Sequence, residues 1–167
     1  KQSGTYWYHS HSGFQEQTGM LGAIVIEPKG RERHPIDEDH VIVLSDWTSR
    51  NPHTLLKLLK PRADFDNYHL PDFKKLLADI AETDLKTAFD KRKSWNQMRM
   101  MPTDFSDLTG ETTFTYLING KTTAANWAQI IKAGQPVKLR FINGAAQTIF
   151  DVRIPGLKMK VVATDGI

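Results

Sequence analysis

The chain has 167 residues, of which 40% are hydrophobic and 25% charged, a composition typical of an ordinary globular protein rather than a disordered one. The net charge is only +3, with basic residues scattered among acidic ones, which gives little support to nucleic-acid binding, and no apolar run approaches the roughly 20 residues that span a bilayer. Cysteine is absent, which excludes disulfides, zinc ribbons, thiol nucleophiles and any copper site that needs a thiolate within these residues.

Residues 4–11, GTYWYHSH, are rich in aromatic side chains and flanked by glycine, which predicts a β-strand. Because side chains alternate across a strand, one face of this strand should carry Thr5, Trp7, His9 and His11. The two imidazoles would lie roughly 6.7 Å apart along the strand. That spacing suits chelation of one metal ion, one ligand for each of two neighbouring ions, or a half-buried strand without any ligand role.

A loop is expected over residues 13–22, GFQEQTGMLG, whose glycines are free to adopt positive φ: Gly13, Gly19 and Gly22. Residues 23–28, AIVIEP, predict a short buried strand closed by proline. The charged stretch 29–40, KGRERHPIDEDH, lacks apolar periodicity and is the best candidate for a solvated linker.

A second unit begins with a predicted strand at residues 40–47, HVIVLSDW. Asn51 followed by Pro52 is a helix-start signal, because asparagine caps the free N–H groups and proline suits the first helical position. This first helix should end before Pro61, which cannot continue it.

Two more helices are expected, which completes a helical insertion at about residues 52–98. The second should start at Pro71 and turn four apolar side chains inward: Phe73, Leu76, Leu77 and Ile80. The third should run from about Asp84 to Met98 with three inward residues: Leu85, Ala88 and Phe89.

After residue 102 the pattern returns to β-structure. Residues 112–119 lead into the turn signal Asn119-Gly120, and residues 136–143 lead into a second one, Asn143-Gly144. Two further strands, at 148–154 and 157–164, should be joined across Pro155-Gly156. Short strands separated by such turns favour an antiparallel sandwich with a helical insertion over a parallel α/β sheet.

The stretch GTYWYHSHSGFQEQTGMLGAIVIEP resembles the end of the first cupredoxin domain of a multicopper oxidase, where it matches the second of two His-x-His pairs. The segments TYLINGK, VKLRFINGA and FDVRIPGLKMKVVATDG resemble successive strands of the second domain of that family. The helical insertion, between LSDWT and QMRMMPTDF, is most similar to the periplasmic copper-resistance oxidases (copper-resistance protein A type).

This resemblance implies a mainly β, cupredoxin-like Greek-key sandwich fold. Residues 1–33 would be the C-terminal part of a first cupredoxin-like domain, and residues 34–167 part of a second one that carries the helical insertion. We expect the chain to be a fragment, since it opens on Lys1 without methionine and runs straight into a strand. Its exposed strand edges are then expected to pair with copies of itself.

The resemblance also implies a site. His9 and His11 would each give one imidazole to one of the two type 3 coppers of a trinuclear cluster, whereas the type 1 and type 2 ligands would lie largely outside the chain. The parent would be a periplasmic oxidase that takes electrons singly from a substrate such as Cu(I) or a phenol and reduces O₂ to water. The fragment itself should be inactive, and no catalytic residue is assigned within it.

Alternatives remain open for the whole protein. A copper-sequestering protein would use the same histidines without oxidase activity, an apo β-sandwich would serve only as an interaction module, and a two-domain copper nitrite reductase is conceivable. The methionines of NQMRMMP are either packing residues or a relay for Cu(I): Met98, Met100 and Met101. Met159 is assigned to the core, and four histidines are assigned to solvent: His34, His40, His53 and His69.

Three further residues also have two interpretations each. Trp7 either forms a wall of a copper pocket or is a core or interface aromatic. Asp46 is either a proton donor or a strand-end carboxylate that caps the next turn, and Glu16 has a similar status.

Overall fold

A computed structural model describes residues 2–30, 34–61, 72–99 and 114–165, with the side chains of 94–99 left out. The described residues fall into two compact units, one of residues 1–52 with 114–167 and one of residues 53–113. None of the described helices is both long and apolar enough to cross a bilayer.

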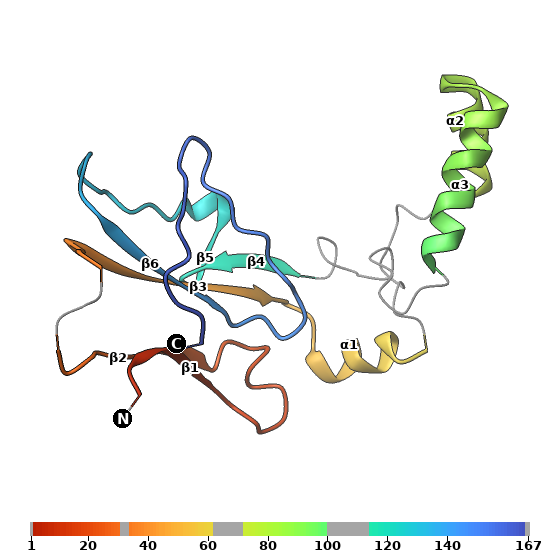
Figure 1. The fold of residues 1–167 in the computed structure, drawn as a ribbon. Coiled ribbons are helices and arrows are strands. Elements are labelled where there is room, and N and C mark those ends of the chain that lie inside the picture. The colour runs from red at the N-terminus through yellow and green to blue at the C-terminus, as the bar shows by residue number, and fades with distance from the viewer. Residues whose placement is uncertain (1, 31–33, 62–71, 100–113, 166–167) are drawn as a thin grey trace. The chain divides into compact units, whose positions relative to one another are not determined.

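The N-terminal strands form an antiparallel hairpin of β1 (Gly4–His9) and β2 (Leu21–Ile26), with His9 opposite Leu21 (Figure 1). The predicted strand is confirmed but ends two residues early. Ser10 N still donates to Met20 O across the hairpin, but Met20 N donates to Gln15 O rather than back to the strand, and Ser12 N donates to Ser10 Oγ, so the residues after His9 belong to a loop. The prediction that the second strand is buried is wrong, because a two-stranded sheet covers little of it and its last three residues are exposed.

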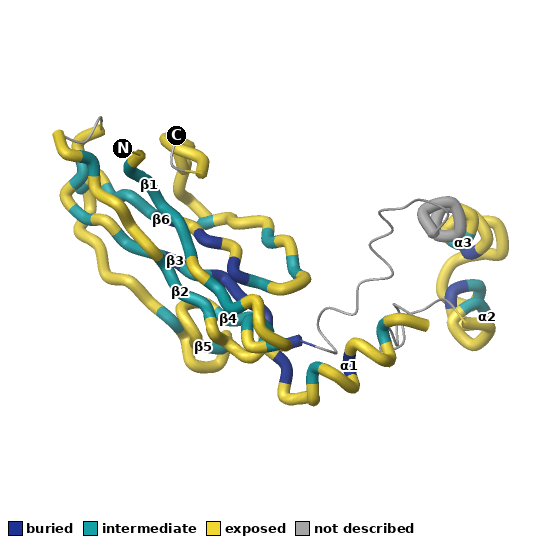
Figure 2. Tube along the Cα trace, turned by 90° about the horizontal axis from the view of Figure 1, so that it is seen from below, coloured by how far each residue is buried: buried dark blue, intermediate teal, exposed yellow. Residues whose placement is uncertain are grey.

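The second sheet of this unit has the order β5-β4-β3-β6. Its strands are β3 (Glu38–Trp47), β4 (Thr115–Ile118), β5 (Lys121–Thr122) and β6 (Val137–Asn143). The buried residues gather on β3 and its neighbours, as Figure 2 shows, and the apolar ones here are Ile42, Leu44, Phe114 and Ile142. Ile142 pairs with Val43 and therefore lies on the opposite face of the sheet from Ile42 and Leu44, on the face where Arg140 donates to Thr5 of the N-terminal hairpin.

The expectation of a purely antiparallel arrangement is wrong, because β3 pairs parallel with β6 and antiparallel with β4. Residue periodicity gives no strand direction. The long connection between β3 and β6 carries the chain back to the end at which β3 begins, which parallel pairing requires.

Only one of the two Asn-Gly signals makes a hairpin. Asn119 (φ 49°) and Gly120 (φ 75°) form the predicted two-residue turn between β4 and β5. Asn143-Gly144 instead ends β6, where Asn143 Oδ1 accepts from Ala145 N and Gly144 N donates to Leu44 O. A Cβ on Gly144 would lie 3.1 Å from the Leu21 side chain, so any larger residue here would require Leu21 to shift by a few tenths of an ångström.

The two strands predicted near the C-terminus are absent from the described residues. The turn at Pro155-Gly156 is present (Gly156 φ 79°), but segments 148–154 and 157–164 have no ladder partner in the described part of the chain. Ile149 is 86% exposed and Val161 is 78% exposed. A strand needs a neighbour to pair with, and these segments have none among the residues that the structure describes.

The other unit contains helices α1 (Pro52–Leu59), α2 (Phe73–Glu82) and α3 (Leu85–Arg99). The predicted start of α1 at Pro52 is confirmed. Helix α2 begins at Phe73, after its N-cap Asp72, whose Oδ1 accepts from Lys75 N. Pro71 lies outside the described residues.

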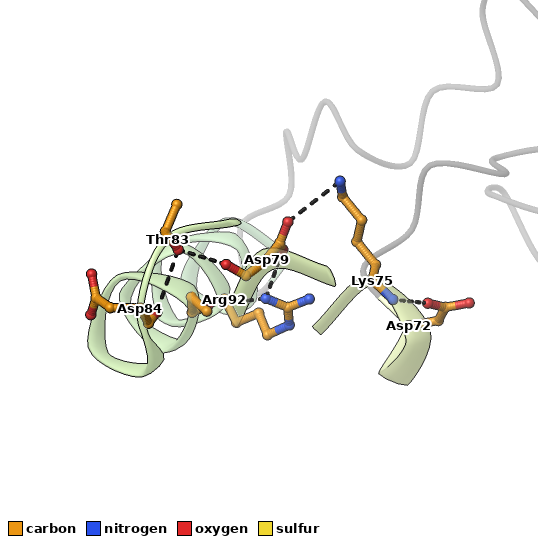
Figure 3. A network of polar contacts seen from close by, with 7 residues as sticks. Asp72, Lys75, Asp79, Thr83, Asp84 and Arg92 are labelled. Carbon is orange, nitrogen blue, oxygen red and sulfur yellow. Dashed lines mark hydrogen bonds and ion pairs between the residues drawn. The ribbon is translucent and has the colours of Figure 1, made fainter. Parts of the chain in front are cut away.

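The inward faces predicted for α2 and α3 are mostly wrong. Ala88 is fully buried, but large exposed fractions remain on Phe73, Leu77, Leu85 and Phe89. A polar cluster occupies the contact instead: the Asp79 carboxylate lies 3.0 Å from Arg92 and 3.4 Å from Lys75 (Figure 3). Burial opposes ionisation of Asp79, but the hydrogen bonds and charges of Arg92 and Lys75 outweigh it, so its pKa lies below the ordinary value of 3.8.

Candidate metal centre

Three rings lie close together at the end of β1, with Trp7 stacked on His9 and His11 tilted against it. The Trp7 and His9 rings have centroids 4.2 Å apart and planes tilted by 14°, while the His9 and His11 centroids are 4.5 Å apart with a tilt of 37°. Trp7 and His9 share a face because they are two residues apart on the strand. His11 joins them from the loop, so the predicted neighbourhood of the two histidines is present although the predicted strand does not reach His11.

The His9 ring presents its two nitrogens to different surroundings. Nδ1 is buried, lies 3.1 Å from Glu16 Oε2, and makes no hydrogen bond in the structure. The ring as a whole is 27% exposed. The nitrogen left for a ligand from outside is therefore Nε2.

The loop that carries Glu16 is held by its own hydrogen bonds. Met20 N donates to Gln15 O at 2.8 Å, Gly19 N donates to Glu16 O at 3.0 Å, and the Ser10 hydroxyl donates to Gln15 Oε1 at 2.6 Å. Gly13 (φ 57°) and Gly19 (φ 104°) adopt the predicted positive φ. Gly22 does not, because it pairs with Tyr8 in the hairpin.

Asp46 ties this loop to the second sheet. Its residue is only 4% exposed, and its carboxylate accepts from the N–H groups of Ala146, Gln147 and Thr148 and from the Thr148 hydroxyl. Gln17 Nε2 donates to both Asp46 O and Asp46 Oδ1, at 3.1 and 3.2 Å. Asp46 is therefore a capping carboxylate, but the turn that it caps lies a hundred residues downstream rather than next in the chain.

A second tie, which the sequence did not indicate, holds the start of β1. Arg140 donates from Nε and Nη2 to the two carboxylate oxygens of Asp39, and from Nη1 to Thr5 Oγ1 at 2.8 Å. A charged residue within the apolar run VKLRFIN was the available signal, since a buried guanidinium needs an acceptor. The histidine strand is thus fixed to the sheet near both of its ends.

The remaining candidates lie elsewhere or outside the described residues. Met100, Met101, His69 and the side chain of Met98 are not described. His34 and His53 are exposed, whereas His40 Nε2 lies 2.8 Å from Glu38 Oε2, so its assignment to solvent is wrong. Met159 is 45% exposed rather than buried in a core. In the part of the chain that the structure describes, no group of three or more His, Asp or Glu is placed to hold a metal ion.

Comparison with known proteins gives two matches to models of the multicopper oxidase family, one over residues 75–167 and one over residues 1–31. Copper resistance protein A of Escherichia coli is 50% identical over 99% of this chain, and that of Pseudomonas syringae pv. tomato is 48% identical over 99%. The multicopper oxidase MmcO of Mycobacterium tuberculosis is 28% identical over 98%. The chain spans only 27%, 27% and 29% of these three relatives, and no solved structure matches it. The family matches together with the identities show that this chain belongs to the multicopper oxidase family.

Proposed function

We propose that His9 and His11 are copper ligands, each giving one imidazole nitrogen to one of the two type 3 coppers of a trinuclear cluster. The observation that carries the proposal is the close approach of the two rings, whose centroids lie 4.5 Å apart. Each imidazole has a nitrogen whose lone pair lies in the ring plane, so each ring offers one ligand atom. Two such rings side by side fit one ligand for each of two neighbouring ions.

The surroundings of the rings fit such a role. Neutral imidazole is a good ligand for copper, and a ligand must be held rigidly for the metal to keep its geometry. Trp7 covers one face of His9, and the ties Arg140–Thr5 and Asp46–Gln17 fix the strand and the loop that carry the histidines. Two imidazoles are only part of a ligand set, so further ligands would come from other segments of a longer chain.

For the whole protein we propose a periplasmic oxidase of copper resistance built from cupredoxin-like Greek-key domains. Membership of the multicopper oxidase family implies the cupredoxin fold, and relatives named copper resistance protein A match nearly the whole chain. Copper, when bound, supplies the redox chemistry that couples one-electron oxidation of Cu(I) or a phenol to four-electron reduction of O₂. The residues around His9 and His11 hold and orient the two imidazoles. The chain by itself has no cysteine for a thiolate copper site, so it should not oxidise substrate or reduce O₂.

The experiment is copper counting in the full-length protein with His9→Ala, His11→Ala and the double variant, by elemental analysis alongside oxygen uptake. We expect each variant to lose copper and oxygen uptake together. His34→Ala is the matched control, because that histidine is exposed and lies outside the ring stack. Unchanged copper content in the double variant would refute the ligand role. A wild type that binds copper but consumes no oxygen, together with loss of copper from the variants, would favour sequestration.

A further inference from the structure

We propose that Glu16 is the positioning residue of His9, whose carboxylate accepts the Nδ1–H of the ring and so leaves Nε2 for the metal. The inference rests on the proposed role of His9 as a copper ligand and adds the residue that selects its ligating nitrogen. Glu16 Oε2 lies 3.1 Å from Nδ1, and the two side chains are 29% and 27% exposed. A metal-ligating histidine usually donates its other N–H to such an acceptor.

The buried Nδ1 of His9 needs a hydrogen-bond acceptor. It is among the few buried side-chain polar atoms without a hydrogen bond in the described residues, although a carboxylate oxygen lies within hydrogen-bond length. A hydrogen bond between the two would satisfy this atom. Hydrogen bonds at sites without their ligand are often poorly aligned and tighten when it binds.

Trp7 cannot determine which ring nitrogen of His9 faces the metal. Its ring stacks on the face of His9, and rotating the imidazole by half a turn about χ2 leaves that stack unchanged while it exchanges the edges of the ring. A carboxylate at one edge distinguishes the two orientations, because only one of them brings Nδ1 to Oε2. The backbone of Glu16 is itself fixed, since its carbonyl accepts from Gly19 N.

His11 provides an internal comparison. Within the described residues it has the ring contact with His9 and no carboxylate partner. The effect of Glu16 should therefore be confined to His9.

The test uses the metal-free full-length protein with ¹⁵N-labelled histidine, and long-range ¹⁵N–¹H spectra that report which ring nitrogen carries the proton. Peaks are assigned with the variants His9→Gln and His11→Gln. We expect the proton of His9 on Nδ1 in the wild type and in Glu16→Gln, whose amide oxygen still accepts. We expect a mixture of both tautomers in Glu16→Ala, with His11 unchanged.

Glu27→Ala is the matched control, because Glu27 follows β2 at the opposite end of the same hairpin. An unchanged His9 tautomer in Glu16→Ala, or an equal change in Glu27→Ala, would overturn the proposal.

Copper competition against a chelator gives the second measurement. Loss of an outer partner of a ligand typically lowers metal affinity about 10- to 100-fold, and we expect this for Glu16→Ala with a smaller loss for Glu16→Gln. If His9→Ala leaves affinity unchanged, the ligand role itself fails, and Glu16 only orients a structural histidine. If His9→Ala abolishes binding while Glu16→Ala has wild-type affinity, the ligand role stands and the positioning role is refuted.

Discussion

Replacing Asp46 by alanine should loosen the contact between the histidine loop and the second sheet. The carboxylate accepts from three backbone N–H groups, from one hydroxyl and from Gln17. The three N–H groups and the hydroxyl lose their acceptor at once, whereas Gln17 keeps its hydrogen bond to the Asp46 backbone carbonyl. The effect should therefore be large in residues 145–150 and smaller in residues 12–20.

The change in the free energy of local opening depends on which donors can form hydrogen bonds to water once the carboxylate is removed. Ala146 and Gln147 are exposed, so their N–H groups are rehydrated at little cost. Thr148 is half-buried and loses two hydrogen bonds to a charged acceptor, each worth roughly 1.5–3 kcal/mol. With allowance for partial rehydration, local opening should become easier by about 2–4 kcal/mol, which corresponds to about 30- to 700-fold faster amide exchange.

Hydrogen exchange by mass spectrometry on the full-length protein measures this directly, because it reports local opening without requiring two-state unfolding. Asp46→Asn keeps one acceptor oxygen and should give an intermediate effect. Asp37→Ala, at an exposed position, should change neither segment. Exchange in residues 145–150 of Asp46→Ala within about threefold of wild type would contradict the predicted loss of at least 2 kcal/mol.

Three further outcomes are expected. Arg140→Met removes the ion pair with Asp39 and the hydrogen bond to Thr5, and should lower the free energy of local opening of residues 4–9 by about 2 kcal/mol. The effect is no larger because Asp39 is partly hydrated. Unchanged hydrogen exchange in residues 4–9 would contradict a role of Arg140 in holding the strand. Asn119→Ala should reduce the protection of the Val43 amide from hydrogen exchange more than Asn119→Gly does. Both variants lose the side-chain hydrogen bond to Val43 N, but alanine at φ 49° adds about 1 kcal/mol of backbone strain. A larger loss of protection in Asn119→Gly would refute this. The pKa values of Asp79 and of Asp84, which is hydrogen-bonded mainly by Thr87, are lowered in the folded state, so both ionised carboxylates should stabilise the helices fully above the ordinary pKa of 3.8. This stabilisation should be lost as the pH falls through the folded-state pKa values. Helical circular dichroism should decrease over the same pH range, and the decrease should be smaller in Asp79→Asn.

The local elements were predictable where neighbouring residues decide them. The aromatic strand, the Asn119-Gly120 hairpin and the proline start of α1 each depend on a few consecutive residues, and all three are present. The limits of β1 were not predictable, because pairing stops where Met20 N donates to Gln15 O within the loop instead of back to the strand.

Direction and long-range polar contacts could not be predicted from the sequence pattern. The parallel pairing of β3 with β6 joins segments about a hundred residues apart, and nothing in their alternation of side chains encodes it. The same holds for the site, where the histidine pair was visible but the acceptors were not. Arg140 and Asp46 become significant only when the fold brings them to Thr5 and Gln17.

The Asp46 capping contact also orders events during synthesis. The histidine hairpin is translated early, but Ala146, one of the donors that complete its anchor, follows Asp46 by a hundred residues. At roughly 5–20 residues per second, about 5–20 seconds separate the two. A two-stranded hairpin by itself is marginally stable, so in that interval the imidazoles have no fixed spacing. The spacing that the proposed copper ligands need is therefore expected only after β6 and the following turn have been made.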